Sequence, residues 1–86
     1  MRVPSMTEER RRDMVKQMHK RAEDARIEIR NARRDEQESV KRAEKEKRIG
    51  SDEAHRRLEA LQKLTDAKTA EIDKLLASKE REVLEG

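Results

Sequence analysis

The sequence predicts an all-α fold, a long antiparallel helical hairpin, and three observations lead to this prediction. Of the 86 residues, 31% are hydrophobic, none is aromatic and 50% are charged, so a compact globular core is hard to assemble. The interior has one break, at residues 48–51, because the only proline is Pro4 and the only glycines are Gly50 and Gly86. On both sides of this break the apolar residues recur at helical spacing.

The first helix is expected over residues 7–47. Thr7 suits an N-cap, and the two glutamates that follow it favour the positive end of the helix dipole. Residues 1–6 contain the proline and are expected to form a hinge segment before the hairpin of residues 7–86.

The second helix is expected over residues 51–84. Gly50 or Ser51 is suited to cap its start, and Asp52 with Glu53 again places acidic side chains in the first turn. A single short turn between two long helices predicts that they pack against each other antiparallel.

One apolar stripe on each helix defines the expected packing seam. The first stripe comprises Met14, Met18, Ala22, Ala25, Ile29, Ala32, Val40 and Ala43. The second comprises Ala54, Leu58, Leu61, Thr65, Ile72, Leu75, Lys79 and Val83. Spacings of three and four residues keep such positions on one helix face, so the methionines are interpreted as core residues.

A second stripe on the first helix is basic. It comprises Arg12, Lys16, His19, Glu23, Arg26, Arg30, Arg33, Gln37 and Lys41. It lies about 100° from the apolar stripe, beside the seam, so we expect it to be free for an outside partner. Arginine forks fit phosphate oxygens, and without aromatic residues a nucleic acid would be contacted through its backbone. The alternative is a solvated face whose arginines pair with nearby carboxylates such as Asp24, Asp35 or Glu36.

Catalytic and membrane functions find no support in the residues. There is no cysteine and no glycine-rich phosphate loop, and His19 and His55 fall on different helices, so no catalytic site, metal or cofactor is expected. The carboxylates have no apolar pocket that would raise a pKa. No apolar run has the length of a membrane span, and we expect a cytoplasmic protein without a small-molecule substrate.

Four sequence blocks occur in the order typical of a known family. They are residues 3–11 (VPSMTEERR), 29–35 (IRNARRD), 62–66 (QKLTD) and 79–82 (KERE). Together they resemble the C-terminal part of ribosome recycling factors, over nearly the whole chain. In that family these two helices join an N-terminal helix in a three-helix bundle, and a small β-rich domain is inserted after that first helix.

The resemblance implies a role in translation. Ribosome recycling factors act after termination on the large-subunit side and, with elongation factor G, split the ribosomal subunits without covalent chemistry of their own. The family's RNIRRD-like motif contacts large-subunit ribosomal RNA (rRNA). It matches the block that contains three arginines here, and the TEERR block supplies two further candidates. The expected rRNA-binding residues are Arg30, Arg33, Arg34, Arg26, Arg10 and Arg11.

The sequence also departs from the family pattern. Ala32, Lys68 and Thr69 stand where larger apolar residues are usual, and Ser5 replaces the second proline of the hinge. The match leaves out the N-terminal helix and the β-rich domain, so we expect either an excised fragment or a short relative. Its apolar seam would be covered by the missing helix or by self-association. The alternative function is a structural coiled-coil hairpin that associates only with protein.

Overall fold

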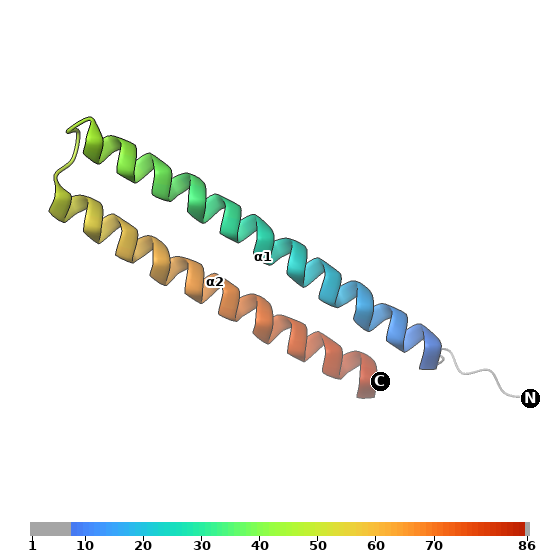
Figure 1. Ribbon diagram of the computed structural model, residues 1–86. Helices are drawn as coiled ribbons and strands as arrows, with labels where there is room; N and C mark the ends of the chain where they lie inside the picture. Colours follow the sequence, from blue (N-terminus) through green and yellow to red (C-terminus); the bar gives the residue numbers. More distant parts are fainter. Residues whose placement is uncertain (1–7, 86) are drawn as a thin grey trace, which may run out of the picture.

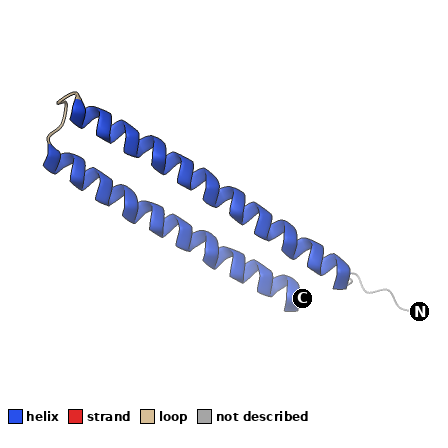
Figure 2. Cartoon of the chain, viewed as in Figure 1, coloured by secondary structure: helices blue, strands red, loops and turns tan. Residues whose placement is uncertain are grey.

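The computed structural model describes residues 8–85, which form two helices. Helix α1 spans Glu8–Lys45 and helix α2 spans Ser51–Glu85. They lie side by side and antiparallel, so the start of α1 and the end of α2 are at the same end of the molecule (Figure 1). The described part contains no strand (Figure 2) and measures 73 × 15 × 10 Å. The predicted all-α hairpin is confirmed, while the expected hinge and the Thr7 cap lie outside the described residues.

Helix α1 ends at Lys45, two residues before the predicted end, in a tight hydrogen-bonded turn. The backbone N–H of Lys47 donates to the carbonyl of Glu44 at 3.0 Å, and that of Arg48 donates to Ala43 at 2.9 Å. Lys47 has φ 63°, the left-handed conformation that this Schellman pattern requires. Glycine is the residue that usually occupies this position, so the end of α1 at Lys45 could not be predicted from the residue type at 47.

Helix α2 starts directly after the glycine. The carbonyl of Gly50 accepts the first helical hydrogen bond, from the N–H of Ala54 at 3.0 Å, so Gly50 is the N-cap residue. Asp52 and Glu53 lie in the first turn as predicted, where their negative charges interact favourably with the positive end of the helix dipole.

Replacing Lys47 with glycine is expected to stabilise the hairpin by about 1 kcal/mol, because glycine adopts the left-handed conformation without the cost that a Cβ imposes. The same replacement two residues earlier, Lys45→Gly, lies inside α1 and is expected to destabilise by about 1 kcal/mol. Thermal unfolding followed by circular dichroism at one fixed concentration compares the two. Destabilisation by both substitutions would contradict the backbone assignment at residue 47.

The seam between the helices is narrow and built from small residues. Ala22, Val40, Ala54 and Thr65 are the buried residues of the described chain. The Thr65 hydroxyl donates to the carbonyl of Leu61 at 2.8 Å, so its burial leaves no unpaired donor. Small side chains allow the two helices to approach closely, but they remove little apolar surface from water. The hairpin therefore has a thin core.

At four positions the residue that faces the seam is the neighbour of the predicted one. Met14, Ala32, Leu75 and Lys79 are exposed, whereas their neighbours Val15, Arg33, Leu76 and Glu80 are half-buried. Adjacent residues differ by about 100° around a helix, so a small rotation of each helix decides which of the two faces the partner. Arg33 lies half-buried at the seam, where its long aliphatic stem can cover apolar surface and its Nε is buried.

Candidate nucleic-acid interface

Arg30 and Arg33 form the centre of the candidate interface on α1. Arg30 is exposed and Arg33 is half-buried, one turn further along the same side of the helix. Within residues 8–85 neither side chain forms an ion pair, and the Nε of Arg33 is buried without a hydrogen-bond acceptor. Their positive charges are therefore not neutralised by a carboxylate of residues 8–85.

Arg34 is held by a local contact. Its Nη2 donates to the Oδ1 of Asn31 at 2.8 Å, one turn earlier on α1. The acceptor is a neutral amide, so Arg34 keeps its net charge while its side chain is oriented. It lies about 40° further round α1 than Arg30, which places it on the outer edge of the same surface.

Arg26 is turned towards α2 instead of towards solvent. Its Nε and Nη2 donate to Asp73 Oδ1 at 3.1 and 2.6 Å, and its Nη1 donates to Glu23 Oε1 at 3.2 Å. The hydrogen bond to Asp73 raises the pKa of Arg26 above its ordinary value, so the guanidinium is charged at every working pH. Two carboxylates surround this charge, and Arg26 acts as a link between the helices.

Arg10 and Arg11, the two predicted rRNA-binding residues near the start of α1, do not join this surface. The Nη1 of Arg11 lies 3.5 Å from the carbonyl of Leu84, near the C-terminus of α2, where a positive charge is favourable. The Nε of Arg11 is buried. Arg10 lies about 160° round α1 from Arg30, so it faces away from the candidate interface.

The basic stripe as a whole is less free than the sequence predicted. His19 Nε2 lies 3.0 Å from Glu80 Oε1 on α2, and Arg26 is paired with Asp73. The predicted local partners Asp24, Asp35 and Glu36 are in none of these contacts. Carboxylates on the facing helix take their place, because the stripe lies beside the seam and within reach of α2.

We name this side of the hairpin the arginine flank; it consists of His19, Arg26, Arg30 and Arg33 on α1 with Gln62, Asp66, Asp73 and Glu80 on α2. From the sequence, Gln62, Asp66 and Glu80 were noted only as members of the family blocks 62–66 and 79–82, and no residue of α2 was predicted to contact the basic stripe. Only the register of the two helices shows which carboxylates meet which arginines. The seven-residue spacing of Asp66, Asp73 and Glu80 was a sequence signal for a shared helix face.

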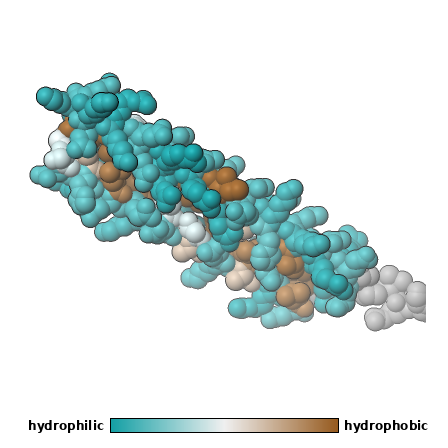
Figure 3. All heavy atoms as spheres, viewed as in Figure 1, coloured by the Kyte–Doolittle hydropathy of each residue, from teal (hydrophilic) through white to brown (hydrophobic). Residues whose placement is uncertain are grey.

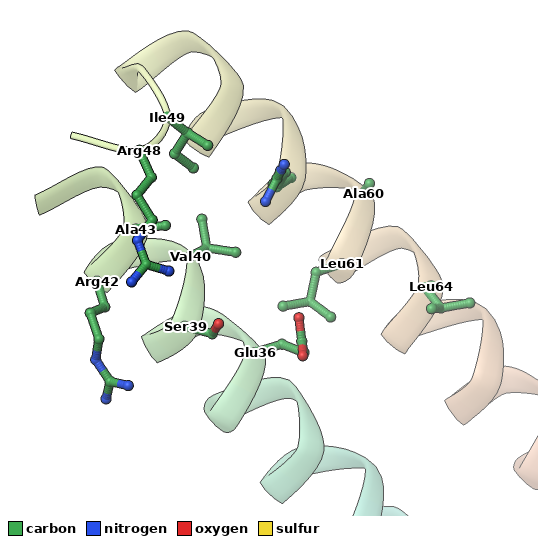
Figure 4. Close-up of a pocket in the computed structure, with 11 residues that line it drawn as sticks. Glu36, Ser39, Val40, Arg42, Ala43, Arg48, Ile49, Ala60, Leu61 and Leu64 are labelled. Carbon is green, nitrogen blue, oxygen red and sulfur yellow. The ribbon is translucent and has the colours of Figure 1, made fainter. Parts of the chain in front are cut away.

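An apolar groove occupies the opposite flank. Near the turn, apolar side chains from both helices line it, among them Val40, Ala43, Leu61 and Leu64 (Figure 4). Polar side chains complete the lining there: Glu36, Ser39, Arg42, Arg48 and Arg57. Further along it continues with Met18, Ala25, Ile72 and Leu75. Leu64 is 57% exposed and Leu75 is 59% exposed. The face of the hairpin drawn in the space-filling view is mostly hydrophilic, and hydrophobic atoms appear on it in separate patches (Figure 3).

Within residues 8–85, no three His, Cys, Asp or Glu side chains come together as a group that could hold a metal ion. Neither described helix has the length and apolar character needed to cross a membrane.

Comparison with known proteins gives consistent matches. The model of the ribosome recycling factor family matches residues 1–84. The ribosome-recycling factor of Symbiobacterium thermophilum is 49% identical over 83 residues, which cover 96% of this chain and 45% of that protein. That of Bartonella henselae is 50% identical over 82 residues, covering 95% of this chain and 44% of the relative. That of Neisseria gonorrhoeae is 49% identical over 82 residues, with coverage of 95% and 44%.

The chain thus spans less than half the length of the curated relatives it matches. The match nevertheless includes helix α1, the turn, all of α2 except its last residue, and every residue of the arginine flank. The chain belongs to the ribosome recycling factor family.

Proposed function

We propose that this hairpin is the ribosome-binding helical part of a translation factor that contacts large-subunit rRNA. With elongation factor G, it helps to disassemble the ribosome after termination. Membership of the family over residues 1–84 supports the role in recycling. The hairpin acts by binding and not as an enzyme, and its place of action is the cytoplasm, where ribosomes work.

The observation that best supports an RNA contact is that Arg30 and Arg33 have no carboxylate partner in the described chain. Both lie on one flank of a rod 73 Å long, and neither is paired with a carboxylate of the described chain. An unpaired guanidinium offers charge-assisted donors to phosphate oxygens. Without an aromatic side chain for base stacking, this surface is suited to the RNA backbone and its shape.

The apolar groove is formed by α1 and α2, and we propose that a further helix covers it. The exposure of Leu64 and Leu75 on the side away from the arginines supports a third helix packed there. In a longer protein this is the family's N-terminal helix; in the isolated hairpin a second copy takes its place. Either occupant leaves the arginine flank accessible.

The alternative function is a coiled-coil hairpin that pairs only with protein. The contacts between α1 and α2 and the open groove would both suit such a role. The two functions differ in their salt dependence, because phosphate contacts release counterions and weaken steeply as salt is added.

Binding to isolated ribosomal subunits tests the proposed function. We expect the chain to sediment with large subunits and not with small subunits, and the logarithm of its affinity to fall linearly with the logarithm of the salt concentration. Equal binding to both subunits, or large-subunit binding that is insensitive to salt, would contradict the proposed rRNA contact.

A further inference from the structure

Two contacts across the arginine flank repeat at the same register. His19 meets Glu80 at 3.0 Å, and Arg26 meets Asp73 at 2.6 Å. Seven residues separate the two members on α1, and seven separate the two on α2. Two further helical turns, about 10.5 Å, therefore place Arg33 at the level of Asp66.

This third pair is not formed. Asp66 Oδ1 instead accepts a hydrogen bond of 2.9 Å from Nε2 of Gln62, one turn earlier on α2. Arg33 has no ion pair in the described chain, and its Nε is buried without an acceptor. The arginine and the carboxylate at this level are thus both present, but the carboxylate is bound along its own helix.

We propose that Gln62 is a positioning residue that holds the Asp66 carboxylate away from Arg33 and so keeps that guanidinium available for an RNA phosphate. The inference rests on the proposed rRNA contact and adds a determinant on α2. Asp66 and a phosphate oxygen are competing acceptors for the same fork of donors. The Gln62 amide satisfies one carboxylate oxygen at i,i+4 spacing and reduces this competition.

Arg26 shows what happens when the facing carboxylate has no hydrogen-bond donor on its own helix: the carboxylate pairs with the arginine. Asp73 has no amide donor from α2, and it accepts two hydrogen bonds from Arg26. Asp66 differs from Asp73 in that it accepts a hydrogen bond from Gln62 on its own helix. Of the two arginines, only Arg33 keeps its charge free of carboxylates in the described chain.

The test compares Gln62→Ala, Asp66→Asn and the double variant in binding to isolated large subunits at low salt. In Gln62→Ala the freed carboxylate pairs with Arg33, and affinity is expected to fall about twofold to fivefold, the factor by which a surface ion pair shifts an equilibrium. Asp66→Asn removes the competitor, so it should bind at least as tightly as the native chain. The double variant should match Asp66→Asn.

A second measurement needs no ribosome. The Nε–H signal of Arg33 in a proton–nitrogen NMR spectrum reports on its pairing in the free chain. Gln62→Ala should shift this signal, and the double variant should return it to the position seen in Asp66→Asn. Circular dichroism checks that each variant stays helical. This is expected because alanine is a better helix former than glutamine, and asparagine and aspartate have similar helix propensities.

Glu71→Gln is the matched control for Asp66→Asn. It removes the same charge from α2, but Glu71 lies about 140° round the helix from Asp66 and contacts Lys68 at 3.5 Å. If Glu71→Gln tightened binding as much as Asp66→Asn does, the tighter binding would come from the lower negative charge of α2 and not from Asp66 itself.

Native affinity and an unshifted Arg33 signal in Gln62→Ala would overturn the inference even if Arg33→Ala weakens binding. Native affinity of Arg33→Ala would instead overturn the proposed site, and the NMR comparison would still test the hold on Asp66.

Discussion

Replacing Arg33 with alanine is expected to weaken binding to the large ribosomal subunit by about 1.5–3 kcal/mol, the value of a hydrogen bond to a charged group. Arg30→Ala should have a similar effect, because Arg30 lies one turn away and is also unpaired within the described chain. Each substitution should reduce the slope of log affinity against log salt concentration by about one for each phosphate contact removed. The measurement is binding to purified large subunits at two salt concentrations, with helicity recorded for every variant.

Arg56→Ala is the matched control for these substitutions. Arg56 is an exposed arginine on α2 that points away from the seam, and Arg57 is less suitable because it donates to Glu53 at 2.9 Å. Equal losses of affinity and equal salt slopes for Arg33→Ala and Arg56→Ala would leave only a diffuse basic surface, and the site would have to be abandoned.

The remaining candidate arginines should rank below these two. Arg26 is surrounded by Asp73 and Glu23, so Arg26→Ala should change affinity less than Arg33→Ala does. Arg34→Ala should have an intermediate effect, because its charge is not neutralised but its Nη2 is engaged by Asn31. A larger loss for Arg26→Ala than for Arg33→Ala would show that the contact with Asp73 is broken on the ribosome.

Leu75→Asp is expected to abolish association of the isolated hairpin through its apolar groove. Burying a leucine side chain contributes about 1.5–3 kcal/mol, and a symmetric dimer loses this twice. The dissociation constant should therefore rise by at least about a hundredfold.

For the native chain we expect helicity and melting temperature to increase with concentration, because the thin core gives a single hairpin only marginal stability. Sedimentation and circular dichroism over a concentration series measure both quantities.

Leu84→Asp is the control for the groove. Leu84 is 54% exposed, close to the 59% of Leu75, but it lines the other flank beside Val15 and Lys16. Its replacement should leave the concentration dependence unchanged. A native chain that is monomeric, fully helical and cooperative in melting at micromolar concentration would show that the groove needs no cover.

The sequence was sufficient for the architecture of the hairpin. One interior glycine, the absence of interior proline and two stripes at helical spacing predicted two long helices, and the structure has Glu8–Lys45 and Ser51–Glu85. These signals are local. Helical periodicity and chain breaks depend on neighbouring residues, so they can be read without knowing what packs against what.

Packing details required the tertiary structure. Whether Leu75 or Leu76 enters the seam depends on a small rotation of each helix, and both residues satisfy the same apolar pattern. The left-handed residue of the turn is Lys47, although glycine is the residue that ordinarily signals this conformation.

For the candidate site, too, one part could be predicted from the sequence and another required the tertiary structure. The arginines of residues 29–35 were recognisable from their spacing and from the family resemblance, and the structure places Arg30 and Arg33 side by side on one flank. Which basic residues meet a carboxylate across the seam was decided only by α2, because antiparallel register brings Asp73 to Arg26 while Gln62 binds Asp66. Register is set by the turn and by packing along the whole seam, and no short stretch of sequence contains that information.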